Sequence, residues 1–168
     1  LDGISFGGFL IKRVVDVLQS EFHGLKTFST LSPIPGFRKW LDETLQSAGE
    51  PFVTGLFTDN DAMALRLAAS LPDEEKVPLQ TILASSNWIE DERISAAVEP
   101  ILMRLCAHYL LKEKGRNGGA KDPVANFHLT NGALVERLCW KGNPTLPGMA
   151  SSYGVMVNYL YRLEKIEE

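Results

Sequence analysis

The feature that most constrains the fold is a long helical pattern, from Phe37 to about Lys114, that lies between segments with extended patterns. Before it, the residues from Leu25 to Leu31 place alternate side chains on opposite sides of a strand. After it come Val124 to Leu129, Leu134 to Trp140 and Gly154 to Tyr161, which have extended or β-rich sequences. We therefore expect one α+β domain with a large helical insertion, at about residues 37–114, between its strands.

Local signals set the expected helix boundaries inside this insertion. The sequence Thr58 to Asp61 predicts an N-cap with an acidic first turn, and Pro72 ends the helix that follows. Pro100 is expected to start or kink the longest apolar helix, Ile101 to Lys114, which should be central to the core. His108 lies on that helix and is interpreted as a packed residue rather than a catalyst.

Composition narrows the class of protein. With 168 residues, 45% of them hydrophobic and 23% charged, the chain is long and apolar enough for one globular domain. A net charge of −4 gives no support for nucleic-acid binding. No apolar run approaches the roughly 20 residues of a membrane span, so no membrane partner is expected.

The cysteine count and the two ends of the sequence bear on the cellular compartment. Cys106 and Cys139 are too few for a disulfide framework, which favours a reducing, intracellular location. The chain begins with Leu1 and not with Met, so we expect upstream residues to be missing. No peroxisomal Ser-Lys-Leu follows Glu168, and we expect a cytoplasmic protein, with an organelle matrix as the alternative.

A rigid corner follows the first expected strand. Pro33 and Pro35 remove two backbone donors and disfavour the α conformation in the residues before them, so Ser32 is held extended at the end of the strand. Gly36 then permits a reversal into the helical region. A hydroxyl fixed in this way suits a reactive or binding group, but the same sequence also describes an ordinary Ser-Pro turn. This segment alone leaves both interpretations open.

The N-terminal segment is the second candidate site. A glycine-rich turn from Asp2 to Gly8 leads directly into an expected helix, Phe9 to Phe22. Backbone N–H groups at the positive end of a helix dipole suit phosphate oxygens. The segment is neither a P-loop nor a Gly-x-Gly-x-x-Gly motif after a strand, and a tight turn into a core helix explains it equally well.

The remaining chemistry is sparse. The three histidines and two cysteines show no paired spacing for a metal, and no Gly-x-Ser-x-Gly motif marks a hydrolase serine. His128 is expected on the polar side of the strand Val124 to Leu129, together with Val124 and Asn126. From the residues alone, the sequence indicates a CoA- or nucleotide-binding α+β enzyme and nothing narrower.

Several blocks together closely resemble the malonyl-CoA decarboxylase family, in the right order and over nearly the whole chain. The blocks are Phe9 to Val15, Thr27 to Phe37, Asp122 to Leu129, Asn131 to Ala133 and Val155 to Tyr161. The resemblance implies that residues 1–168 are the C-terminal part of a catalytic domain with a fold similar to the GNAT acyltransferases. It also implies a preceding helical domain that assists homo-oligomer formation.

The resemblance also implies site residues. Ser32 matches the active-site serine of the family, His128 the active-site histidine, and Tyr161 a tyrosine near the reacting acyl group. The segment that holds the CoA phosphates would comprise Asp2, Gly3, Ile4, Ser5, Phe6, Gly7 and Gly8.

The implied reaction is conversion of malonyl-CoA to acetyl-CoA and CO2. Loss of CO2 leaves an enolate on the thioester, which is itself the electron sink, so no metal, biotin or pyridoxal is expected. We expect His128 to donate the proton. Ser32 is expected to bind the malonyl carboxylate or thioester and to relay a proton, rather than to form an acyl-enzyme. Two alternatives are a GNAT-type acyltransferase that uses CoA thioesters and an amine acceptor, and a non-catalytic CoA-binding module.

Overall fold

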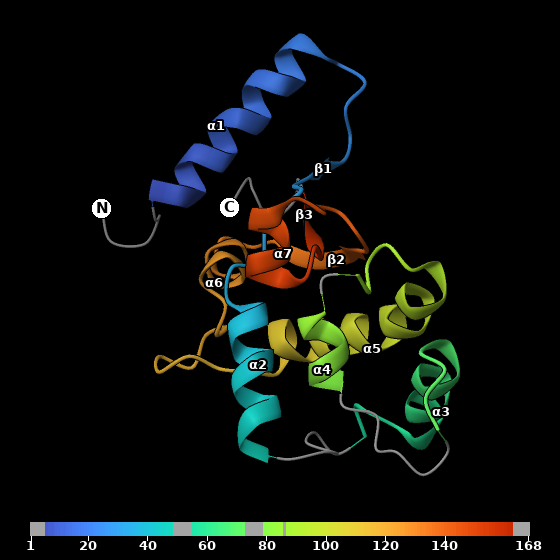
Figure 1. The fold of residues 1–168 in the computed structure, drawn as a ribbon. Coiled ribbons are helices and arrows are strands. Elements are labelled where there is room, and N and C mark those ends of the chain that lie inside the picture. The colour runs from blue at the N-terminus through green and yellow to red at the C-terminus, as the bar shows by residue number, and fades with distance from the viewer. Residues whose placement is uncertain (1–5, 49–54, 73–78, 86, 163–168) are drawn as a thin grey trace. The chain divides into compact units, whose positions relative to one another are not determined.

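The computed structural model describes residues 6–48, 55–72, 79–85 and 87–162 (Figure 1). The chain divides into two compact units. We call residues Phe37–Tyr109 the helical unit, and the residues up to Gly36 and from Leu110 onward the sheet unit. The elements are α1 Phe6–Glu21, β1 Phe28–Ser29, α2 Phe37–Ala48, α3 Asp59–Ala68, α4 Leu79–Ala84, α5 Glu92–Leu111, α6 Pro123–Thr130, β2 Leu134–Cys139, α7 Leu146–Ser152 and β3 Met156–Tyr161. The α+β class expected from the sequence is confirmed.

The helical unit contains α2, α3, α4 and α5 as far as Tyr109. Helix α5 supplies much of its core, because Val98, Ile101, Leu102 and Leu105 are fully buried. Their spacing of three and four residues places them on one side of the helix. The helical pattern of this region therefore predicted its structure well.

Pro100 was expected either to start or to kink the long apolar helix, and the expected start was wrong. Helix α5 begins at Glu92, contains Pro100 and ends at Leu111, three residues before the expected Lys114. A proline inside a helix costs about 3 kcal/mol, whereas burying one large aliphatic side chain contributes about 1.5–3 kcal/mol. Burial of Val98 and Ile101 on either side of the proline is therefore enough to keep the helix continuous.

Within the described residues, α5 is also the one helix long and apolar enough to cross a membrane. The sequence-based expectation considered only uninterrupted apolar runs, and charged residues interrupt this helix. Four of its apolar residues, Val98, Ile101, Leu102 and Leu105, are fully buried, whereas Leu111 at its end is exposed.

The helical unit also contains an aromatic cluster. The ring of Trp40 lies 5.2 Å from that of Tyr109 and stacks on His108 at 6.0 Å, and Phe37 lies 5.8 Å from Tyr109. The interpretation of His108 as a packed residue agrees with this stacking.

The cap expected at Thr58 is confirmed. Thr58 accepts a hydrogen bond from the Asp61 N–H, and Asp61 accepts one from the Thr58 N–H, which completes a capping box. Arg104 of α5 donates to Asp61 at 2.8 Å. Burial opposes ionisation of Asp61, but the hydrogen bonds from Arg104 and Thr58 outweigh it and hold the pKa of this carboxyl below its usual value.

The sheet unit is built on a three-stranded antiparallel sheet with the order β1-β3-β2. The strands expected at Leu134 to Trp140 and Gly154 to Tyr161 are confirmed as β2 and β3. The strand expected at Leu25 to Leu31 shrinks to two residues in β1, followed by an isolated bridge between Ser32 and Val157. Because Pro33 and Pro35 lack N–H groups, pairing cannot continue beyond Ser32.

The strand expected at Val124 to Leu129 is wrong, because these residues lie in helix α6. Asp122 caps the helix and Pro123 occupies its first turn, a combination typical of helix starts. Period-two alternation in so short a segment could not separate the two structures, and this start signal decides between them.

Helix α1 begins at Phe6, three residues before the expected Phe9. Phe6, Gly7 and Gly8 are therefore helical and do not form a turn before the helix. The predicted phosphate-binding residues Asp2, Gly3, Ile4 and Ser5 lie outside the described residues.

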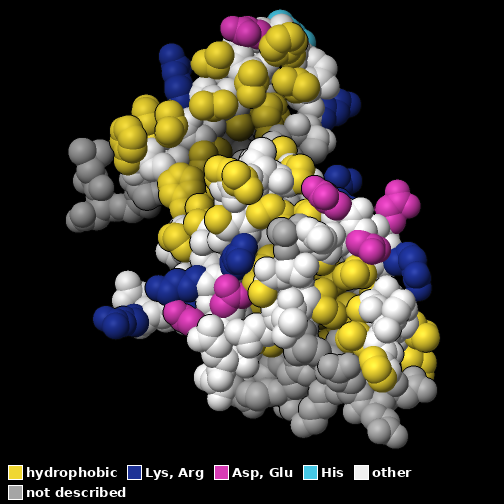
Figure 2. Space-filling model, viewed as in Figure 1, with side chains coloured by type: hydrophobic (Ala, Val, Ile, Leu, Met, Phe, Trp, Pro, Cys, Tyr) yellow, Lys and Arg dark blue, Asp and Glu magenta, His cyan; other side chains and the backbone are white. Residues whose placement is uncertain are grey.

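Figure 2 shows hydrophobic side chains gathered over α1, where Phe6, Phe9, Leu10 and Val14 are exposed.

Candidate active site

Ser32 is held against the central strand. Its N–H donates to the carbonyl of Val157 at 2.8 Å, and the Val157 N–H donates to the Ser32 carbonyl at 3.0 Å. Only 5% of the Ser32 residue is exposed. The extended, fixed serine that the two prolines predicted is therefore present.

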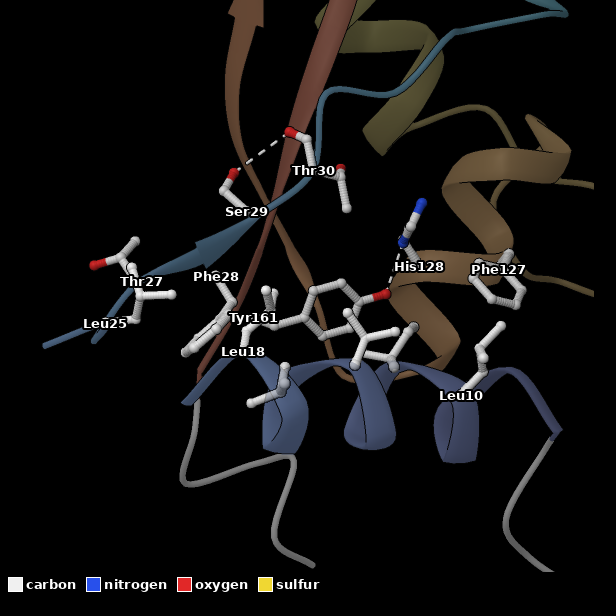
Figure 3. Close-up of a pocket in the computed structure, with 13 residues that line it drawn as sticks. Leu10, Leu18, Leu25, Thr27, Phe28, Ser29, Thr30, Phe127, His128 and Tyr161 are labelled. Atoms are coloured by element: carbon white, nitrogen blue, oxygen red, sulfur yellow. Dashed lines mark hydrogen bonds between the residues drawn. The ribbon is translucent and has the colours of Figure 1, made fainter. Parts of the chain in front are cut away.

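The structure brings His128 and Tyr161 to this serine. His128 Nε2 lies 3.4 Å from Ser32 Oγ, although 96 residues separate them in the chain. His128 Nδ1 lies 2.6 Å from the Tyr161 hydroxyl, which Figure 3 shows pointing from β3 toward the histidine of α6. The three side chains form one hydrogen-bonded row, Ser32–His128–Tyr161.

Thr30 extends this row and was missed by the sequence reasoning. The Ser32 hydroxyl donates to Thr30 Oγ1 at 2.8 Å, and the Tyr159 N–H donates to the same oxygen at 3.2 Å. The Asn158 side-chain amide donates to the Thr30 carbonyl at 2.7 Å. A signal was available, because residues two apart in an extended segment lie on the same side.

The environment of the row sets its protonation. The His128 ring stacks on Tyr159 at 4.4 Å, and desolvation lowers the pKa of His128. Desolvation also raises the pKa of Tyr161 to about 12. Near neutral pH both groups are therefore uncharged, and we assign the Tyr161 hydroxyl as donor to Nδ1. Nε2 then carries the histidine proton and points it at Ser32.

An open, mostly apolar cavity of about 400 Å³ adjoins the row (Figure 3). Side chains of α1 line one side, and His128 and Tyr161 line part of the other. The lining residues are Leu10, Ile11, Val14, Val15, Leu18, Leu25, Thr27, Phe28, Ser29, Thr30, Phe127, His128 and Tyr161. His128 and Tyr161 are thus partly buried among apolar side chains at the edge of this cavity, and burial desolvates both groups.

The start of α1 approaches α6 at Gly7. A Cβ atom on Gly7 would collide with the ring of Phe127, the neighbour of His128 in the chain. The glycine therefore permits close packing of two helices, a role the sequence reasoning did not assign. Phe6 and Gly7 lie in the first turn of α1, where a helix leaves backbone N–H groups without intrahelical partners.

Within the part of the chain that the structure describes, no group of three or more His, Cys, Asp or Glu side chains could hold a metal ion. The groups that converge on the site are hydroxyls and one imidazole. Their chemistry is hydrogen bonding and proton transfer.

The site is thus a serine–histidine–tyrosine row able to move a proton, in an α+β fold. Comparison with protein families agrees with a specific class: the model of the malonyl-CoA decarboxylase C-terminal domain matches residues 1–168. The chain belongs to this family.

Named relatives support the same conclusion. The chain is 47% identical over 166 residues to mitochondrial malonyl-CoA decarboxylase of Mus musculus. This aligned region is 98% of this chain and 33% of the mouse protein. Identity to the mitochondrial malonyl-CoA decarboxylase of Anser anser anser is 44% over 165 residues, covering 98% of this chain and 32% of the relative. The chain thus spans about a third of the length of the curated relatives it matches.

Solved structures match over the same extent. Malonyl-CoA decarboxylase from Rhodopseudomonas palustris superposes with a TM-score of 0.77 at 41% identity, over 99% of this chain and 34% of that one. The enzyme from Agrobacterium vitis gives a TM-score of 0.75 at 40% identity, over 99% of this chain and 36% of that one. The fold described above is therefore similar to the corresponding region of these proteins.

Proposed function

We propose that the protein to which this chain belongs converts malonyl-CoA to acetyl-CoA and CO2. The observation that carries the proposal is the contact between Ser32 and His128, in a chain that belongs to the malonyl-CoA decarboxylase family. In the reaction the carbon–carbon bond to the carboxylate breaks, and its electron pair passes into the thioester as an enolate. One proton then forms the new C–H bond.

His128 is the proposed proton donor. Burial lowers the pKa of His128, so the imidazole is neutral in the free protein near neutral pH. A bound malonyl carboxylate brings a negative charge that favours the imidazolium form, so the histidine takes up a proton as the substrate binds. After decarboxylation, Nε2 gives this proton to the enolate carbon and the imidazole is neutral again.

Tyr161 supports both forms of the histidine. Its hydroxyl donates to Nδ1 of the neutral ring and accepts from Nδ1–H of the imidazolium, and the contact of 2.6 Å suits either direction. Its raised pKa of about 12 keeps the hydroxyl protonated throughout. Tyr161 therefore orients the ring.

Ser32 is proposed to hydrogen-bond the malonyl carboxylate or the thioester oxygen rather than to form an acyl-enzyme. A donor aimed at an oxygen that gains negative charge is typically worth about 3–4 kcal/mol in the transition state. In the free protein the Ser32 hydroxyl donates to Thr30 Oγ1, so its single hydrogen would have to turn from Thr30 to the substrate oxygen. The fixed backbone of Ser32 on Val157 supports this role, because it holds the oxygen in place while the hydrogen changes partner.

The CoA phosphates are proposed to bind at the start of α1, through the segment Asp2 to Gly8. The first turn of a helix of 16 residues supports this placement, since its N–H groups and dipole favour phosphate oxygens. Phe6, Gly7 and Gly8 would contribute backbone groups from within the helix.

The proposal includes the wider setting of the chain. We propose that it is the C-terminal part of a GNAT-like catalytic domain, with homo-oligomer formation assisted by a preceding helical domain. We also propose a reducing compartment, either the cytoplasm or an organelle matrix, because two cysteines are too few for a disulfide framework. Sedimentation and fluorescence imaging of the natural protein test the last two points.

The central test is to measure acetyl-CoA and CO2 formed from malonyl-CoA by the natural protein, with a metal chelator present and no acceptor amine. Ser32→Ala and His128→Ala should each lower turnover by at least about 10²-fold, the scale of general acid–base groups. If the well-folded protein binds CoA but releases no CO2, the proposed decarboxylation is wrong. Turnover that appears only with an amine would instead indicate an acyltransferase, and CoA binding indifferent to both variants would indicate a non-catalytic module.

A further inference from the structure

Asp122 makes contacts with two separate segments of the sheet unit. Its carboxylate is fully buried. One oxygen, Oδ1, accepts from the N–H groups of Val124 and Ala125, each at 3.0 Å, and so caps α6. The other oxygen, Oδ2, accepts from the N–H of Gly36 at 3.2 Å, which lies 86 residues earlier in the chain.

These two segments are the ones that carry Ser32 and His128. Gly36 follows Ser32 by four residues, across Pro33, Pro35 and the fully buried Ile34. Fixed proline φ angles make this segment stiff, so a displacement of Gly36 is passed on toward Ser32. On the other side, α6 begins directly after Asp122 and contains His128.

We propose that Asp122 is a positioning residue that sets the separation of Ser32 and His128 by holding both segments on one buried carboxylate. The inference rests on the proposed function of this pair. The distance of 3.4 Å between Ser32 Oγ and His128 Nε2 is already at the long end for a hydrogen bond, so little displacement is tolerated. A misplacement of about 1 Å in a catalytic group can lower a rate by roughly 10²-fold.

The chemistry explains why a carboxylate is needed here. A single acceptor such as a serine hydroxyl could cap α6, but it could not also reach Gly36. Asparagine has one oxygen for the cap and a terminal NH2, which would place a donor against the Gly36 N–H. Asp122→Asn therefore keeps the cap of α6 and breaks the contact with Gly36 selectively.

A purely structural role makes a different prediction, so a matched control is available. Thr145 caps α7 in the same unit by accepting from the Gly148 N–H at 3.3 Å. Its helix carries none of the proposed site residues. Thr145→Ala therefore removes a cap without touching the row of Ser32, His128 and Tyr161.

The first experiment is a double-mutant cycle on the natural protein, using malonyl-CoA turnover. Asp122→Asn should lower kcat about 10-fold to 100-fold and change KM less than about 3-fold, while Thr145→Ala leaves kcat within about 2-fold. In a Ser32→Ala background the effect of Asp122→Asn on kcat should shrink to less than about 3-fold. An equal loss in both backgrounds, or a loss explained by the unfolded fraction alone, would overturn the proposal.

A second readout separates this inference from the proposed function. The imidazole signals of His128 can be followed by NMR as a function of pH, with the resonance assigned by His128→Gln. Ser32→Ala and Asp122→Asn should both shift the apparent pKa of His128, and Ser32→Ala should have little further effect in the Asp122→Asn protein. If the wild-type protein fails to release CO2, the proposed function fails, and this titration still decides the role of Asp122. A His128 titration unchanged by Asp122→Asn would refute that role.

Discussion

The two units are built in opposite ways. The helical unit is one continuous segment, Phe37–Tyr109, with buried side chains that are mostly apolar and a charged pair, Arg104–Asp61, between its helices. The sheet unit joins two segments that lie on either side of it in the sequence, and its interior contains hydroxyls, an imidazole and a buried carboxylate. The difference teaches that local patterning is enough to specify a helical core, whereas a polar site depends on contacts between distant residues.

The largest contrast is expected from replacing one histidine in each unit by glutamine. His128→Gln should lower kcat for malonyl-CoA decarboxylation by at least about 10²-fold, because the proposed proton donor is lost. His108→Gln removes a ring stacked on Trp40 in the helical unit and should leave kcat within about 3-fold. Steady-state turnover at equal folded concentration measures both, and equal losses would remove the distinction between the units.

In the helical unit, a substitution in the core should lower the free energy of unfolding. Leu105→Ala deletes a fully buried side chain and should lower the free energy of unfolding by about 2–5 kcal/mol. Leu67 is 65% exposed, so Leu67→Ala is the control and should cost less than about 0.5 kcal/mol. Urea denaturation followed by circular dichroism compares the two. A cost below 1 kcal/mol for Leu105→Ala would mean that α5 is not central to a core.

A smaller effect is expected at Thr30, which contacts the Ser32 hydroxyl. Thr30→Val keeps the shape of the side chain but loses the hydrogen bonds to Ser32 and to the Tyr159 N–H. A neutral hydrogen bond contributes about 0.5–1.5 kcal/mol, which corresponds to a loss of kcat of about 2-fold to 12-fold. Thr30→Ser retains the hydroxyl and should restore most of the rate. Equal kinetics for the two variants would show that the hydroxyl has no role.

The smallest expected effect is a difference between the two units in how folding stability falls with pH. The pKa of His128 is lowered in the folded protein, so the unfolded chain binds a proton first as the pH falls below about 6.5, and stability declines from there. The pKa of Asp61 is lowered from 3.8, so the stability that it contributes is lost only as the pH falls below that value. His128→Gln should flatten the first decline and Asp61→Asn the second. Free energies of unfolding measured across pH 7 to 3 would contradict this assignment if either variant altered the other window.

The contrast also explains what the sequence could predict. The apolar spacing through Ile101, Leu102 and Leu105 and the Thr58 cap are local signals, and each led to a helix that is observed, although the start of the first was placed too late. The meeting of Ser32, His128 and Tyr161 depends on packing across 96 residues, which no local spacing encodes. Those residues were singled out by resemblance to a family.

Two errors have a common origin in competition between local rules and their surroundings. Residues Val124 to Leu129 can be read as an alternating strand, but Asp122 and Pro123 start a helix, and the buried carboxylate stabilises that start. Pro100 disfavours a continuous helix, but the apolar residues around it have more to gain from burial. In both cases a long-range or end effect outweighed a short pattern.

The order of the strands has a consequence for synthesis on the ribosome. The central strand β3 is the last element of the described chain, and both β1 and β2 pair with it. A nascent chain therefore cannot complete the sheet, or bring Tyr161 to His128, until residue 161 has left the exit tunnel. The helical unit is contiguous, so all of its residues emerge before β3, while the segment with Ser32 waits without its partner strand. In this period β1 is an unpaired edge, so a chaperone that binds early should act mainly on this segment.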